Sequence, residues 1–499
     1  MSARLPPPLR PSSAPPPPVA TRVLHAINTC TSAAALAPIR DGILREPALL
    51  RSTTIVSAFF LACGRLRHHS PALALFASLP RPHVFVFNSL LRSLPASPCS
   101  PLPLFRHFLR LGVRPNRYTF PLMLTHLSSL RDLRVVHSQV IRSGFRADLH
   151  VRNALLARYA ACDPDMAHAE QLFDEMPCLD VVAWTTVITS YRNRGRSFQA
   201  LATFRQMLAS SVAPNRVTMV SALGACAAHG AMDTGIWIHE YVKKQGWELD
   251  VVLGTALVDM YGKCGRVVEA LRVFSEMAER NVYTWNSIIG AFALAEDGKT
   301  ALQFFSHMNA DGVRPDEVTL VCVLCACAHA GFVEIGRKIF NLLVQGEYGF
   351  QPGIKHFGCM VDLLCRSGHL DDAFKVIETM PSQPNAVIWG LLLRGCRAHG
   401  DSFLSEHVTK QLVELEPENA SHYVLLSHLY AETGRWMEAE EVLKWVKRKG
   451  LMKDAGWSLK MLEDSSEDYV SDGELMECAF LTHCHGYATI IKLPKERGF

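Results

Sequence analysis

The chain of 499 residues is 49% hydrophobic and 20% charged, with a formal net charge of +4 and an isoelectric point of about 8.3. This near-neutral balance argues against a protein that binds nucleic acid mainly through phosphate contacts, although it permits binding by other means. The fifteen cysteines are scattered and odd in number, which argues against a small disulfide-stapled module and predicts mostly reduced, buried thiols. The longest apolar runs fall short of the roughly 20 residues that span a bilayer, so we expect no contact with a membrane.

The first 40 residues differ in composition from the rest of the chain. They contain arginine, serine, threonine and many prolines, and the first acidic residue is Asp41. Such a stretch is typical of an organelle transit peptide, and a proline-rich disordered leader without an address is the alternative. We expect residues 1–40 to direct the protein to the mitochondrion, with the chloroplast as the alternative destination.

An internal repeat occupies most of the remaining chain. In its clearest part, units start 35, 35, 31, 35 and 37 residues apart, at Val181, Arg216, Val251, Val282, Glu317 and Ile354. Extending this register predicts degenerate repeats in 18–83, a regular array over 84–385 and two further degenerate repeats in 386–458. The divergent tail, 459–499, contains an acidic run and is predicted to be disordered.

Residue types recur at fixed distances from each unit start and predict a helical hairpin. A glycine 14 residues after the start, such as Gly265, suits the left-handed residue that ends a first helix. Small, aromatic and methionine residues 19, 23 and 26 after the start form one stripe on a second helix, as do Ala301, Phe305 and Met308. Each hairpin can bury this stripe only against its neighbours, so the sequence predicts an all-α solenoid.

Several segments closely resemble pentatricopeptide repeats, among them 282–289 (VYTWNSII) and 255–265 (TALVDMYGKCG). The alternating unit lengths are similar to those of the plant PLS class, and 389–400 (WGLLLRGCRAHG) resembles the extra repeats of its E subgroup. The resemblance implies a right-handed superhelical solenoid of helix-turn-helix repeats that binds single-stranded organellar RNA. It further implies a site-recognition factor for cytidine-to-uridine editing of organelle transcripts.

In that family the fifth and last residues of a unit contact one base, and the second residue wedges between bases. The resemblance implies a pyrimidine read by Asn88 with Asn116, uracil by Asn153 with Asp180 and by Asn286 with Asp316, and adenine by Thr185 with Asn215 and by Thr255 with Asn281. The implied stacking residues are Phe85, Val182, Val252 and Tyr283. One small polar pair per repeat can read one splayed base, and stacking supplies affinity. The alternative is that the paired side chains only cap helices and form turns.

Four units depart from this pattern at the fifth place. Pro121, Val220, Val321 and Gly358 offer no side-chain hydrogen bond to a base edge, so the bases of their units stay unassigned.

Fragments of the zinc deaminase signature also occur, as H-x-E from His168 to Glu170 and as C-x-x-C from Cys322 to Cys325. Both fall inside repeat helices far apart in the chain, which indicates core packing, not metal ligation. We therefore expect no catalytic residue, no metal site and no cofactor. A deaminase would be supplied by a partner protein bound through 386–458. The alternatives are an organelle RNA stability, splicing or translation factor, and a helical-repeat scaffold for protein interactions.

Overall fold

The computed structural model describes residues 18–94 and 101–450, and these residues form α-helices joined by short turns, without a β-strand. The chain separates into two compact units, Met1–Val187 and Ile188–Phe499, and the division falls inside the helix α12 (Val181–Asn193). The all-α class predicted from the repeat is confirmed.

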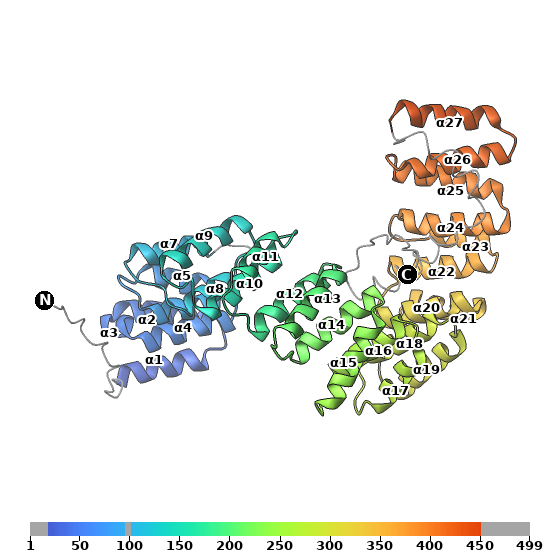
Figure 1. Cartoon of the computed structure of the whole chain (residues 1–499). Helices are drawn as coiled ribbons and strands as arrows, with labels where there is room; N and C mark the ends of the chain where they lie inside the picture. The colour runs from blue at the N-terminus through green and yellow to red at the C-terminus, as the bar shows by residue number, and fades with distance from the viewer. Residues whose placement is uncertain (1–17, 95–100, 451–499) are drawn as a thin grey trace. The chain divides into compact units, whose positions relative to one another are not determined.

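The first unit is built from short helices that follow one another closely along the chain (Figure 1). A 3₁₀ turn, Ala33–Ala35, precedes α2. The helices are α1 (Pro18–Thr29), α2 (Leu36–Arg45), α3 (Pro47–Arg51), α4 (Thr53–Arg65), α5 (Ser70–Ala77), α6 (Val84–Ser93), α7 (Leu102–Arg110), α8 (Thr119–Thr125), α9 (Leu130–Arg142), α10 (Leu149–Cys162) and α11 (Ala167–Asp174).

The second unit alternates first and second helices of successive hairpins (Figure 1). The first helices are α14 (Arg216–His229), α16 (Val251–Lys263), α18 (Val282–Leu294), α20 (Glu317–Ala330), α22 (Ile354–Arg366), α24 (Ala386–His399) and α26 (Ala420–Glu432). The second helices are α13 (Ser197–Ala209), α15 (Met232–Lys244), α17 (Val267–Glu276), α19 (Gly298–Ala310), α21 (Val333–Val344), α23 (Leu370–Glu378), α25 (Ser402–Leu415) and α27 (Trp436–Arg448).

First helices of the second unit begin at the residues where the repeat register starts a unit, as at Arg216, Val282 and Ile354. In the first compact unit, α8 begins at Thr119, the third place of its repeat, and is only seven residues long. Pro121 lies in the first turn of α8, where a missing backbone N–H removes no helical hydrogen bond.

The hairpins stack in two layers. Consecutive first helices pack directly on one another from α14 through α24, and each second helix contacts its own first helix and the first helix of the next hairpin. The predicted stripe on the second helices provides this contact: Ala301 and Met308 are fully buried and Phe305 is 9% exposed. Each hairpin therefore buries its apolar face only through its neighbours, as a solenoid requires.

The glycine that follows the first helix adopts the predicted left-handed conformation, with a φ of 76° at Gly265 and 68° at Gly331. The hairpin that starts at Val282 has Glu296 at this place, and Glu296 also has a positive φ of 59°. A left-handed backbone strains any residue that carries a Cβ atom, so this turn is less favourable than its equivalents.

Small residues bring neighbouring first helices into close approach. A Cβ atom built on Gly262 of α16 would lie 2.6 Å from the Cβ of Ala291 in α18. No larger side chain fits at this contact without separating the two helices.

The N-terminal part of the described chain is packed. Residues 18–40, which belong both to the expected leader and to the first degenerate repeat, form α1, the 3₁₀ turn and the start of α2. Ile27 and Leu36 are fully buried there, and α1 contacts α4. Residues 1–17 and the tail 459–499 lie outside the described residues, so the expected leader and the expected disordered tail stay predictions.

Within the described residues, no helix combines the length and the apolar character that crossing a bilayer demands. The cysteines of the described residues are all free, and most of them are buried.

Candidate nucleic-acid interface

The fifth residue of a unit lies on the first helix, and the last residue lies just before the first helix of the next unit. The structure brings three of the five predicted pairs into direct contact. The amide nitrogen Nδ2 donates a hydrogen bond from Asn286 to Asp316 Oδ1 at 2.9 Å, from Asn153 to Asp180 Oδ2 at 2.8 Å and from Asn88 to Asn116 Oδ1 at 3.3 Å.

The fourth pair is joined through a third side chain. Thr255 Oγ1 shares a 2.7 Å hydrogen bond with Thr284 Oγ1, which lies 3.1 Å from Asn281 Oδ1. In the fifth pair, Thr185 Oγ1 bonds the carbonyl oxygen of Val181 at 2.6 Å, and Asn215 caps α14. Thr185 lies in the first of the two compact units of the structure and Asn215 in the second.

The last residues are also helix caps, as the alternative interpretation expects. Asn215, Asn281 and Asp316 each accept the N–H of the residue three places on, and the hydroxyl of that residue accepts their own N–H in return. Asp180 likewise accepts the N–H of Ala183 at 2.9 Å. Capping and pairing are therefore compatible, because one side chain can use different lone pairs or oxygens for each.

In two units with an apolar fifth residue, the last residue caps the next helix and also pairs with an arginine. Asp250 forms an ion pair with Arg216, the first residue of its own unit, at 2.7 Å, and Asp148 lies 3.4 Å from Arg117 in the same relation. Burial alone would raise the pKa of Asp250, but the N–H of Leu253 and the Arg216 guanidinium hold that pKa below its usual value. These carboxylates are already occupied, consistent with units that lack a base-reading pair.

The predicted stacking residues are exposed at the start of their first helices. The exposed fraction is 52% for Phe85, 49% for Val182, 63% for Val252 and 59% for Tyr283. Their repeated position at the start of a first helix places apolar surface next to the paired residues, where a base could stack.

The sequence analysis missed two equivalent residues in the long units. Tyr118 and Val217 occupy the second place of units whose fifth residue is apolar, and they are 56% and 59% exposed. Their position in the register was a sufficient signal.

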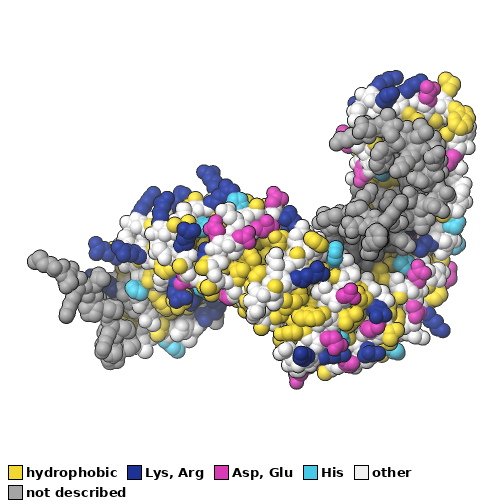
Figure 2. All heavy atoms as spheres, in the orientation of Figure 1, with side chains coloured by type: hydrophobic (Ala, Val, Ile, Leu, Met, Phe, Trp, Pro, Cys, Tyr) yellow, Lys and Arg dark blue, Asp and Glu magenta, His cyan; other side chains and the backbone are white. Residues whose placement is uncertain are grey.

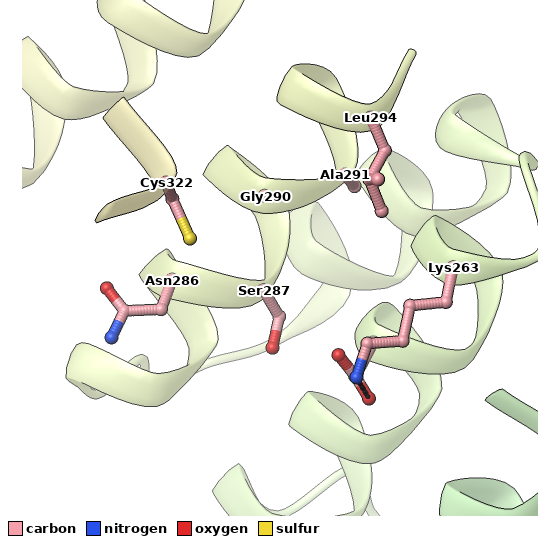
Figure 3. A pocket seen from close by; sticks show the side chains of 8 residues that line it. Lys263, Asn286, Ser287, Gly290, Ala291, Leu294 and Cys322 are labelled. Carbon is pink, nitrogen blue, oxygen red and sulfur yellow. Dashed lines mark hydrogen bonds and ion pairs between the residues drawn. The ribbon is translucent and has the colours of Figure 1, made fainter. Parts of the chain in front are cut away.

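A shallow hollow opens on the first-helix layer beside Asn286 (Figure 3). Its lining combines Asn286 and Ser287 of α18 with Cys322 of α20 and with Asp259 and Lys263 of α16. Lys263 donates to Asp259 at 3.0 Å, which balances most of its charge. Elsewhere on the visible face of the second unit, Lys and Arg side chains are interspersed with Asp and Glu (Figure 2). Binding here would depend on polar pairs and exposed apolar side chains more than on a basic field.

The fragments that resemble a deaminase signature are part of the repeat packing. His168 lies in α11 and its Nδ1 is 2.7 Å from Asp163, while Cys322, Cys325 and Cys327 are all buried in α20. Burial raises the pKa of the Cys327 thiol to about 12, so the thiol stays protonated at neutral pH. Among the described residues, no three His, Cys, Asp or Glu side chains are grouped as metal ligands.

Models of known protein families match the repeat array and the segment that follows it. The PPR repeat model matches residues 182–212 and 255–282, a second repeat model matches 348–381, and the PPR repeat family model matches 280–329. The E motif model matches 399–459, over the last helical pairs.

Known proteins are similar over most of the chain. Pentatricopeptide repeat-containing protein At5g56310 of Arabidopsis thaliana is 34% identical over 464 residues, which cover 85% of this chain and 87% of that protein. The CRR2, chloroplastic protein of the same organism is 35% identical, and the match covers 83% of this chain and 64% of that protein.

A solved structure supports the fold independently. The pentatricopeptide repeat protein PPR10 in complex with an 18-nucleotide psaJ RNA element superposes with a TM-score of 0.69 at 20% identity, over 86% of this chain and 64% of PPR10. The chain therefore belongs to the pentatricopeptide repeat family, in the E subgroup of its PLS class.

Proposed function

We propose that this protein binds single-stranded organellar RNA by sequence and marks sites for cytidine-to-uridine editing, with the deaminase supplied by a partner. The proposal rests mainly on one observation: in three repeats the predicted fifth and last residues form a direct side-chain hydrogen bond, and in two of these repeats an exposed aromatic residue, Phe85 or Tyr283, stands at the second place. The matching family models describe repeats and the E motif, not a catalytic domain.

The polar pairs have the hydrogen-bonding character that base reading requires. Asp316 can accept the N3–H of uracil while the amide of Asn286 donates to a uracil carbonyl oxygen. Cytosine lacks the N3–H, so the Asp316 carboxylate would face an acceptor. In unit order, the pairs favour a pyrimidine, any base, uracil, adenine, any base, adenine and uracil.

The exposed second residues supply affinity that does not depend on base identity. Stacking of one base on such a side chain contributes about 1–3 kcal/mol. Because Tyr118 and Val217 are exposed in units without a readable pair, those units can hold a base without selecting it.

The segment 386–458 is proposed to recruit the deaminase. In its described part, 386–450, the three most exposed large apolar side chains are Phe403 at 87%, Trp436 at 69% and Met437 at 81%. Exposed apolar residues on a folded repeat suit a protein partner better than a polyanion. Replacing all three with serine should prevent co-purification of the partner and abolish editing without weakening RNA binding.

Localisation in an organelle follows from this function. Names of curated relatives include both mitochondrial and chloroplastic proteins. We propose the mitochondrion, with the chloroplast as the alternative; the composition of the leader does not separate the two, and a fluorescent fusion of the full chain would decide between them.

The first experiment is fluorescence polarisation of the full chain with an RNA that carries the decoded bases. The comparison RNA has adenine and uracil exchanged at the assigned positions. We expect at least about tenfold weaker binding to the exchanged RNA, since several hydrogen-bonding pairs are lost together. Equal binding of both RNAs would overturn the base assignments, and binding of neither would favour a protein scaffold.

A further inference from the structure

A threonine in the third place of a unit contacts the base-reading pair of the unit before it. Thr319 Oγ1 lies 2.5 Å from Asn286 Oδ1 and 2.9 Å from Asp316 Oδ1. Thr119 makes the same contacts with Asn88 Oδ1 at 2.9 Å and Asn116 Oδ1 at 3.0 Å. Both threonine side chains are fully buried, so they cannot touch RNA themselves.

The hydrogen bonds of Thr319 determine how the amide of Asn286 is oriented. Thr319 Oγ1 accepts the N–H of Asp316, and its single proton satisfies the otherwise unpaired Asn286 Oδ1. The Asn286 amide then keeps its oxygen toward Thr319 and one N–H on Asp316. Asn286 is itself only 1% exposed, so a base would reach its second N–H only after displacing neighbouring side chains. That N–H would suit a uracil carbonyl oxygen and not the amino group of cytosine.

Along the array, the residue type at the third place of a unit correlates with the residue type at the fifth place of the unit before it. A threonine follows the polar fifth residue in four units, as Thr119 after Asn88, Thr218 after Thr185, Thr284 after Thr255 and Thr319 after Asn286. After an apolar fifth residue or glycine the third residue is Val151, Leu253, His356 or Ile388.

Helix capping alone does not explain this pattern. Asp148, Asp250 and Asn385 cap their helices through the backbone N–H of Val151, Leu253 and Ile388, which carry no hydroxyl. The threonine hydroxyl is therefore dispensable for the cap, and its recurrence coincides with the presence of a polar reading residue.

One unit breaks the pattern and shows what the hydroxyl does. Ala183 follows the pair of Asn153 and Asp180, and Asn153 Oδ1 is a buried oxygen without a hydrogen-bond partner. Only the bond from Asn153 Nδ2 to Asp180 restrains that amide. The hydroxyl that Thr319 provides to Asn286 has no counterpart at Ala183.

We propose that the third-place threonine is a positioning residue, which orients the reading residue of the preceding unit and strengthens its choice of base. This inference rests on the proposed RNA-binding function. It means that Asn286 with Asp316 discriminates uracil from cytosine more strongly than Asn153 with Asp180 does.

The test uses the full chain with RNAs that carry uracil or cytosine opposite either of these two units. Ala183→Thr should raise the uracil-to-cytosine affinity ratio at the Asn153 position by about fivefold, the effect of one added hydrogen bond, and leave the Asn286 position unchanged. Thr319→Val should lower the ratio at the Asn286 position, and Thr319→Ser should retain it.

The outcomes separate the two proposals. If the wild-type chain discriminates at both positions but neither Ala183→Thr nor Thr319→Val changes a ratio, the positioning role is overturned. If the wild-type chain shows no discrimination at any assigned position, the base-reading function itself fails. A Thr319→Val chain that does not fold leaves Ala183→Thr as the deciding variant, because threonine is the residue that other repeats accommodate at this buried place, as at Thr119 and Thr284.

Discussion

Asp316 and Thr319 exchange hydrogen bonds at the start of α20, where the N–H of Thr319 donates to Asp316 Oδ1 at 2.8 Å and the N–H of Asp316 donates to Thr319 Oγ1 at 3.1 Å. The same carboxylate accepts the amide of Asn286. A residue proposed to identify a base therefore also begins a helix, so folding and recognition can be separated only with well-chosen substitutions.

Asp316→Asn preserves the cap and should change the base preference. Asparagine caps helices as well as aspartate does, so we expect unfolding free energy to change by less than about 0.5 kcal/mol. Preference at this position should relax from uracil toward either pyrimidine. Asp316→Ala, the control, should lose about 1 kcal/mol of stability as well as the preference. Urea denaturation and polarisation assays measure the two effects.

Thr255→Asn combined with Asn281→Asp converts an adenine pair into the uracil pair seen at Asn286 and Asp316. Thr284 is already in place to contact the new asparagine. We expect the double variant to prefer uracil over adenine at this one position by about tenfold, with other positions unchanged. A double variant that still prefers adenine would contradict the assignment.

Tyr283→Ala should weaken RNA binding without changing base preference. Loss of one stacked base costs about 1–3 kcal/mol, so the dissociation constant should rise at least fivefold for every RNA tested. Phe198→Ala is the matched control, because Phe198 is an aromatic residue of similar exposure, 64%, on the second helix α13. Equal effects of both changes would argue against a stacking role for Tyr283.

Acid should destabilise the fold through buried histidines. Burial lowers the pKa of His356, against the opposing effects of the carbonyl and carboxylate of Glu317. Its Nδ1 accepts the N–H of Gly353 at 3.0 Å, which requires the unprotonated nitrogen. Burial also lowers the pKa values of His137, His239 and His329.

The direction of the pH effect follows from these lowered values. Since the unfolded chain binds protons more readily, with a histidine pKa of about 6.5, stability is complete above that pH and declines as the pH falls below it. Melting temperatures between pH 8 and pH 5 should show this decline. His356→Thr, which keeps an acceptor for Gly353, should make the decline shallower, and an unchanged slope would exclude His356 as a contributor.

Glu296→Gly should stabilise the protein. Glu296 is an exposed residue held at a positive φ, at the place where other hairpins carry glycine. Relief of backbone strain, less the added entropy of the unfolded chain, should raise the free energy of unfolding by about 0.5–1 kcal/mol. Glu240→Gly within α15 is the control and should lower it by about 1 kcal/mol. A destabilising effect of Glu296→Gly would show that the turn is not strained.

The sequence predicted features that depend on one hairpin and its own periodicity. The apolar stripe of Ala301, Phe305 and Met308 and the left-handed Gly265 follow from local rules of helix packing and termination, and the structure has both. The family match also agrees with the resemblance of the quoted segments. Base contacts by the paired residues remain predictions.

The stacking of hairpins was predicted, but individual side-chain contacts between two hairpins, such as that of Thr319, were not. The contact between Thr319 and Asn286 joins residues 33 positions apart, and nothing in either segment alone indicates it. The unpartnered oxygen of Asn153 is equally invisible in sequence, since Ala183 is an ordinary residue in a helix. Such contacts require the spacing between consecutive first helices, which only the folded chain supplies.

That spacing is set by contacts such as the one between Gly262 and Ala291, where a Cβ atom on the glycine would come within 2.6 Å of the neighbouring methyl group. The separation of adjacent first helices is also the separation of the side chains that would meet adjacent bases. A methyl group at Gly262, which touches no base, would therefore lengthen one step of the array relative to the nucleotide repeat of a bound strand. Every base beyond that step would be displaced from its pair, so the fidelity of the whole array depends on the smallest side chains in its interior.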